Sequence, residues 1–194
     1  MFRCHYHGAD WHYLVFPRAL HNAFLKNWPQ VGLYFTIEKS TWPYLDYKCV
    51  FPTSNLVYLK SCSDVLTKHS KQLREMLADT TRLEVLDLFT WYGYQFSMGD
   101  EKLPPVKHLF LRQCDWKHSP AAVKRIFDFS QLETLVLEPG HWWQDILPFL
   151  RSVTAEQFPR LKKLEIMNKQ ESTSTTSYGK EVNDLLQTSL DWRT

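Results

Sequence analysis

A repeated pattern of aliphatic residues constrains the fold of this chain more than any other feature. Four segments read Leu/Val-x-x-Leu-x-Leu/Ile, at residues 83–88, 106–111, 132–137 and 161–166. A fifth copy at 56–61 ends on serine, and a degraded sixth copy, whose register the sequence leaves open, lies at 31–36. Consecutive copies start on average 26 residues apart. A period of this length is typical of proteins that stack one structural unit along the chain.

The last two aliphatic positions of each copy are two residues apart, so a β-strand would point both side chains to the same side. One such strand cannot bury its apolar side alone, whereas several strands side by side form a continuous core. We therefore expect an α/β fold with five to six parallel strands, one for each copy of the pattern.

The segments between the copies should form a second layer over the apolar side of the sheet. Apolar residues recur there at helical spacing, and Pro120 stands where a helix can begin. No helix is expected between residues 91 and 105, because two glycines and two prolines interrupt that segment. Residues 170–179 are rich in Ser and Thr and are expected to form a flexible loop. Helices are expected over residues 17–27, 63–78, 119–127, 144–154 and 182–190.

Taken together, these repeats resemble the leucine-rich-repeat family. The period and the helical outer layer are similar to the cysteine-containing subtype found behind F-boxes in ubiquitin-ligase adaptors. Cys114 stands at the Asn/Cys position of that family, whereas other copies have Trp91, Gly140 and Lys169 there. Segments 130–138 and 158–166 are similar in style to the F-box-type repeat proteins of filamentous fungi.

The resemblance implies one leucine-rich-repeat solenoid domain over residues 1–194, complete or a fragment, with the clearest repeats at 56–168. Its horseshoe arc would carry a parallel sheet on the concave side and helical or irregular segments on the convex side. The resemblance also implies substrate recognition for an SCF-type ubiquitin ligase. The Leu-Pro-x-Glu opening of an F-box is not found before Pro17. Ligase subunits are therefore expected as partners only if an F-box is present elsewhere.

The predicted concave face is the candidate binding surface, because the residues between the inward aliphatic positions should line it in three columns. Aromatic and arginine side chains in an exposed cluster are typical anchors of protein interfaces. The alternative is that the aromatic residues are covered by a loop or a neighbouring domain, or are exposed without a partner. The first column is Tyr58, Val85, His108, Thr134 and Lys163; the second is Lys60, Asp87, Phe110, Val136 and Glu165; the third is Cys62, Phe89, Arg112, Glu138 and Met167.

Composition and charge favour protein recognition over other functions. The formal net charge is only +2, and charges of both signs alternate on the predicted face, so no nucleic-acid partner is expected. No apolar run is long enough for a signal peptide or a membrane span, and four cysteines are few for a small secreted scaffold. We expect a cytoplasmic or nuclear location. There is no Gly-x-Ser-x-Gly motif and no glycine-rich phosphate loop, so we expect a non-enzymatic protein without a cofactor.

One N-terminal cluster supports a rival function of another class. Its side chains are of metal-binding types, and zinc favours Cys and His. No second Cys or His pair stands at the spacing of a zinc finger, so we expect no metal site. A metal-binding or enzymatic protein that uses this cluster is the alternative function, and the product of a truncated reading frame is a third interpretation. The cluster comprises Cys4, His5, His7, Asp10 and His12.

Overall fold

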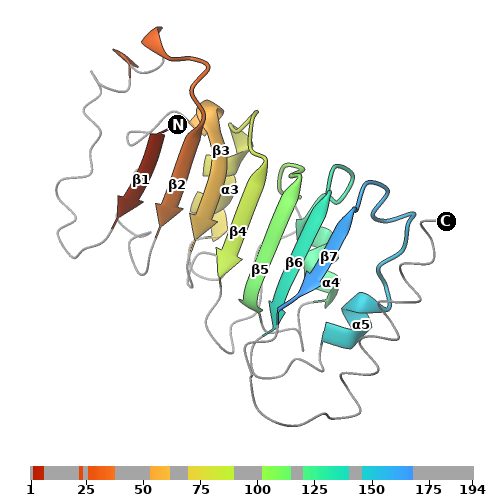
Figure 1. Ribbon diagram of the computed structural model, residues 1–194. Coiled ribbons are helices and arrows are strands. Elements are labelled where there is room, and N and C mark those ends of the chain that lie inside the picture. Colours follow the sequence, from red (N-terminus) through yellow and green to blue (C-terminus); the bar gives the residue numbers. More distant parts are fainter. Residues whose placement is uncertain are drawn as a thin grey trace.

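The computed structural model shows an α/β fold in which every strand of a seven-stranded sheet runs parallel to its neighbours. The strands follow one another across the sheet in sequence order (Figure 1). They are β1 Phe2–Tyr6, β2 Leu33–Ile37, β3 Leu56–Ser61, β4 Val85–Phe89, β5 His108–Cys114, β6 Thr134–Pro139 and β7 Lys163–Ile166. The structure describes residues 2–6, 22–23, 26–37, 53–61, 70–89, 102–114, 120–139 and 146–167.

The repeated aliphatic positions lie opposite one another from strand to strand, which confirms the predicted strands β3 to β7. The first inward position pairs across these five strands as Leu59, Leu86, Leu109, Leu135 and Leu164. The next inward position pairs as Ser61, Leu88, Leu111, Leu137 and Ile166. The members of both rows on β3 to β6 are buried, and those on β7 are partly buried against the same core.

Backbone hydrogen bonds join successive copies just before the strands. The carbonyl of Glu84 accepts bonds from the amides of Lys107 and His108 at 3.0 and 2.9 Å. The carbonyl of Lys107 does the same for the next copy, and that of Glu133 for the last one. Each copy is therefore fixed to the next one by main-chain atoms at a constant position of the repeat.

The N-terminal part of the sheet goes beyond the prediction in two ways. The register of the copy at 31–36, which the sequence left open, is set by buried Leu33 and Phe35, and Tyr34 lies beside Tyr58. An irregularity between Leu33 and Tyr34 shifts the pairing by one residue and hides the pattern. Strand β1 extends the sheet to seven strands, so the predicted number of five to six was too low.

Three described helices lie on one side of the sheet: α3 Ser70–Ala78, α4 Pro120–Ile126 and α5 Leu147–Leu150 (Figure 1). Helix α3 buries Leu73, Met76 and Leu77, which helical spacing brings to one face. A single turn of 3-10 helix, Thr53–Asn55, leads into β3. Among the described residues, no helix is both long and apolar enough to cross a lipid bilayer.

Helix α5 is shorter than the predicted 144–154. The amide and hydroxyl of Ser152 both donate to the carbonyl of Phe149, and the amide of Val153 donates to that of Leu150. These bonds to the third residue back end the helix. Residues 22–23 and 26–27 are helical. The remainder of the predicted 17–27 helix, the start of the 63–78 helix, most of 91–105, the 170–179 loop and the 182–190 helix lie outside the described residues.

Candidate functional site

The fourteen described residues of the three predicted columns form the surface that we call the candidate face. They alternate with the buried aliphatic positions, so they point away from the core that the helices cover. The first column pairs in register from Tyr58 to Lys163 and the second from Lys60 to Glu165. In the third, Phe89, Arg112 and Glu138 are paired neighbours, and Met167 donates its amide to the Leu137 carbonyl. Cys62 lies outside the described residues.

The candidate face is less exposed than the sequence predicted. Asp87 and Val136 are 3% exposed and Glu138 is 1% exposed, so the expectation that they face water was wrong. Most of the other members are half-buried, and Lys163 is exposed. Val136 and Asp87 lie on either side of Phe110 in the second column. Lateral contact between side chains of adjacent strands reduces their exposure.

Arg112 lies at the centre of a charge cluster on this face. Its Nε is 2.7 Å from Oδ1 of Asp87, and its Nη1 is 3.3 Å from Oε2 of Glu138. The guanidinium carbon also lies 5.4 Å from the centre of the Phe110 ring, at cation–π distance. Burial acts to lower the pKa of Arg112, but the hydrogen bonds and charges of Asp87 and Glu138 outweigh it and raise that pKa. The bonds of Arg112 to these two carboxylates link three adjacent strands, β4, β5 and β6.

An aromatic pair continues this cluster toward the N-terminal strands. The rings of Tyr34 and Tyr58 are stacked with their centres 5.9 Å apart. The Tyr58 hydroxyl donates to Oδ2 of Asp87 at 3.5 Å. A continuous strip of aromatic and charged side chains thus crosses the candidate face from β2 to β6.

The pKa of the Tyr58 hydroxyl tests whether this group is buried beside Asp87 in the strip. Burial, followed by the negative charge of Asp87, raises the pKa of Tyr58 to about 12. Because the folded pKa lies above the ordinary value of 10.0, Tyr58 contributes stability that is complete below about pH 10 and is lost as the pH rises toward 12. We expect ultraviolet titration of the phenols to show a late-titrating group that Tyr58→Phe removes. A titration unchanged by this substitution would contradict the burial of the hydroxyl.

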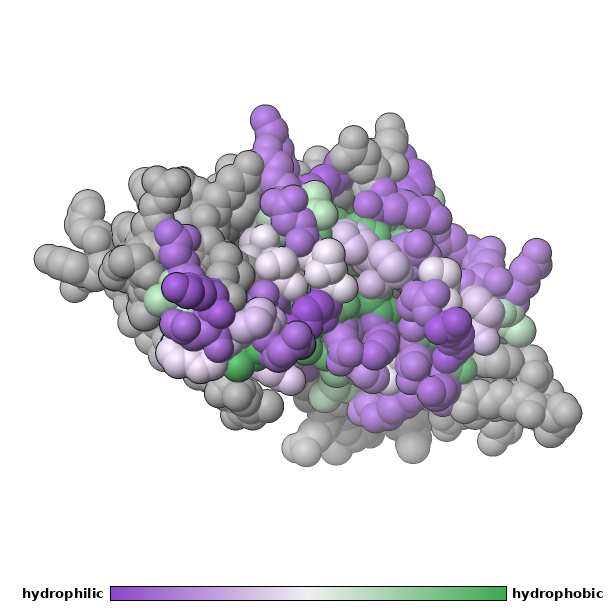
Figure 2. Space-filling view, turned by 90° about the horizontal axis from the view of Figure 1, so that it is seen from above, coloured by the Kyte–Doolittle hydropathy of each residue, from purple (hydrophilic) through white to green (hydrophobic). Residues whose placement is uncertain are grey.

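A row of alternating charges lies at the edge of the sheet where the strands begin, which we call the starting edge. Lys107 pairs with Glu84 at 2.7 Å, and Lys162 pairs with Glu133 at 2.8 Å. The hydrogen bond from Lys107 to Glu84 raises the pKa of Lys107, and the hydrogen bond from Lys162 lowers the pKa of Glu133. Seen from this edge, hydrophilic side chains cover much of the described surface, with hydrophobic residues visible between them (Figure 2).

The sequence prediction missed this row, although its signal was present. The second position of successive copies reads Val, Glu, Lys, Glu and Lys. Opposite charges at the same position of adjacent repeats face each other once the repeats stack.

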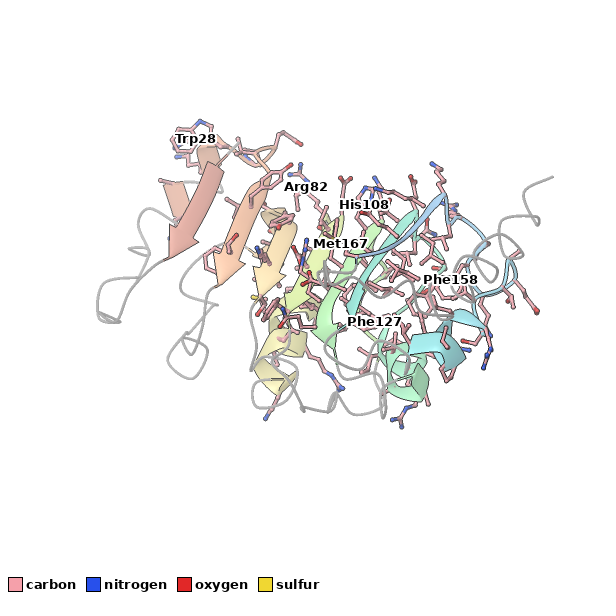
Figure 3. The ribbon with its side chains drawn as sticks, turned by 60° about the horizontal axis from the view of Figure 1, so that its bottom comes forward. Trp28, Arg82, His108, Phe127, Phe158 and Met167 are labelled. Carbon is pink, nitrogen blue, oxygen red and sulfur yellow. The ribbon has the colours of Figure 1, made fainter. Side chains whose placement is uncertain are left out.

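An open pocket of about 610 Å³ also lies at the starting edge. Trp28, Arg82 and His108 lie along this same edge (Figure 3). The prediction missed the pocket, because the turn before β4 forms part of its wall and no repeat pattern marks that turn. The pocket is lined by Gly32, Tyr34, Val57, Thr81, Arg82, Leu83, Glu84 and Lys107.

The structure places two members of the N-terminal Cys/His cluster, Cys4 and His5, on β1. The other members, His7, Asp10 and His12, lie outside the described residues. Within the part of the chain that the structure describes, no three His, Cys, Asp or Glu residues are grouped as metal ligands would be. No metal site is built from the described residues.

Comparison of the chain with protein-family models, with curated proteins and with solved structures finds no match.

Proposed function

We propose that the chain is a leucine-rich-repeat solenoid whose candidate face recognises another protein without catalysing a reaction. The sequence order of the parallel strands, and their in-register aliphatic rows, support the solenoid. In such an array each repeat contacts its neighbours, and one side of the sheet remains available for a partner.

The single observation that carries the proposed function is the strip from Tyr34 to Glu138. It combines tyrosine, phenylalanine and arginine side chains, which are the residue types that dominate binding energy at protein interfaces. Phe110 and Arg112 are both half-buried, so part of each side chain remains accessible to a partner. The lateral hydrogen bonds of Arg112 hold its guanidinium in place before a partner arrives, which reduces the entropy lost on binding.

The resemblance to F-box-type repeat proteins narrows the proposal to substrate recognition for an SCF-type ubiquitin ligase. This narrower role requires an F-box segment in the same protein. It is supported by the resemblance of the repeats alone.

Capture of partners from an extract of the native cell tests the candidate face. Two single variants, Phe110→Ala and Lys60→Glu, alter side chains of the face and keep all three residues of the Asp87–Arg112–Glu138 ion pairs. Because the centre of an interface carries most of the binding energy, we expect Phe110→Ala to reduce partner recovery at least tenfold. Lys60→Glu should reduce recovery of the same partners.

The matched control is Lys71→Glu, the same charge reversal on the exposed surface of helix α3. We expect it to retain its partners. Full recovery with Phe110→Ala, or equal losses with Lys60→Glu and Lys71→Glu, would contradict recognition through the candidate face. Circular dichroism of each variant establishes that the fold is retained.

A further inference from the structure

The pocket at the starting edge contains one positive charge that the described carboxylates do not balance. Of its lining residues, Arg82 and Lys107 are cationic and Glu84 is anionic. Lys107 pairs with Glu84 at 2.7 Å, so these two charges offset each other. No carboxylate of the described residues pairs with Arg82. The lining therefore has a net positive charge, which is located on the Arg82 guanidinium.

The Arg82 guanidinium is held in place by neutral groups. Its Nη1 donates to the carbonyl of Pro29 at 3.3 Å, and its Nη2 donates to the carbonyl of Gln30 at 3.2 Å. These two bonds orient the planar group without neutralising it. A guanidinium has five N–H donors in a fixed fork, so three donors remain for a ligand. An anchored arginine with spare donors favours a planar anion such as a carboxylate.

The wall of the pocket depends on a close backbone approach at Gly32. A β-carbon at this position would lie 2.8 Å from Cγ2 of Val57, which is too close for two carbon atoms. A side chain at position 32 would therefore displace Val57, which also lines the pocket. Glycine allows the β2 segment to lie against β3 at this point.

The pocket opens beside the candidate face, because Tyr34 joins the two. Its ring stacks on Tyr58 of the first column and also lines the pocket. A peptide that crosses the first column at Tyr58 would therefore pass beside the pocket. The volume of about 610 Å³ lies within the range of roughly 300–1,000 Å³ that is typical of ligand sites.

We propose that this pocket binds the carboxylate side chain of an acidic residue in a protein partner, and that the Arg82 guanidinium donates hydrogen bonds to this carboxylate. The inference rests on the proposed function only in taking the carboxylate to come from a protein partner. A single negative charge matches the net charge of the lining. A doubly charged phosphate group fits less well, because the Glu84 carboxylate would repel it.

Binding of blocked peptides to the full chain labelled with ¹⁵N tests the site. The probes are acetyl-Ala-Leu-Glu-Leu-Ala-amide and the same peptide with glutamine in place of glutamate. For a single charge-assisted contact we expect a dissociation constant on the order of millimolar. The glutamate peptide should shift the amide signals of Gly32, Thr81, Arg82, Glu84 and Lys107, and the glutamine peptide should shift them at least tenfold less.

Arg82→Gln and Arg160→Gln form a matched pair of variants. Both arginines directly precede the first leucine of their copies, but Arg160 bonds to the side chain of Gln131 and does not line the pocket. We expect Arg82→Gln to abolish the glutamate-dependent shifts and Arg160→Gln to retain them. Shifts that persist in Arg82→Gln, equal shifts with both peptides, or shifts produced by inorganic phosphate but not by the glutamate peptide would overturn the proposal.

The peptide assay needs no native partner, so its outcome is separate from that of the capture experiment. Loss of partners with Phe110→Ala together with no peptide binding at the pocket would remove the carboxylate site and leave the proposed function standing. Peptide binding at the pocket together with full partner recovery by Phe110→Ala would support the carboxylate site and contradict recognition through the candidate face.

Discussion

Replacing Arg112 with methionine is expected to destabilise the folded chain by about 3 kcal/mol, because the change leaves two buried carboxylates without their cation. Asp87 and Glu138 are 3% and 1% exposed, so water cannot replace the guanidinium as their partner. This loss is at the lower end of the range of stability losses for broken buried ion pairs, because the Arg112 side chain is 23% exposed. Urea denaturation at neutral pH measures the loss.

The matched control is Lys107→Met, which removes a cation that lies at the same distance, 2.7 Å, from its carboxylate. Both members of that pair are about half exposed. Water and salt screen exposed charges, so this variant should change stability much less than Arg112→Met. Equal losses from the two substitutions would show that burial does not set the strength of the Arg112 cluster.

A triple variant tests the cause of the loss. Adding Asp87→Asn and Glu138→Gln to Arg112→Met removes both stranded charges at nearly constant volume. We expect the triple variant to recover part of the lost stability, because neutral amides are less costly to bury than unpaired carboxylates. A triple variant less stable than Arg112→Met would contradict this explanation.

Replacing Phe158 with alanine is expected to destabilise the chain by about 3–5 kcal/mol. Phe158 is fully buried before β7. Its ring stacks on Phe129 with centres 4.5 Å apart, and the edge-on Phe149 of helix α5 lies 6.4 Å away. The substitution leaves a cavity between the last strands and helix α5. Thermal unfolding should show a midpoint lowered by roughly 6 °C or more.

Phe110→Ala is the control for this prediction, because it removes the same side chain from a half-buried position on the candidate face. It should cost clearly less stability than Phe158→Ala. The two substitutions then separate the two roles of phenylalanine in this chain, since only Phe110→Ala is expected to reduce partner recovery at retained stability. Similar unfolding midpoints for both variants would contradict the assignment of Phe158 to the core.

The strands β4 to β7 could be predicted because each carries aliphatic residues two apart at a regular interval, and β3 because it keeps the first of these at the same interval. The same pattern set the register of the three columns, since parallel neighbours that share a repeat position must pair there. The register of β2 escaped this reasoning for a physical reason. The irregularity between Leu33 and Tyr34 moves the inward positions of β2 by one residue, and a shift of one residue exchanges the two faces of a strand.

Burial on the candidate face could not be predicted from the pattern. Alternation indicates which side of the sheet a residue faces, but it does not indicate how its lateral neighbours cover it. Asp87 is buried because Tyr58 and Arg112, which come from the copies before and after it, both bond to its carboxylate. The pocket was missed for a similar reason, since Arg82 reaches carbonyls 53 and 52 residues earlier in the chain.

The carbonyls of Glu84, Lys107 and Glu133 each accept hydrogen bonds from two main-chain amides of the following copy. These main-chain bonds can form whichever side chains stand at these positions. Outward-facing residues outside the Arg112 cluster can be exchanged one at a time while these main-chain bonds keep the spacing of the copies, so binding specificity can vary without a change in architecture.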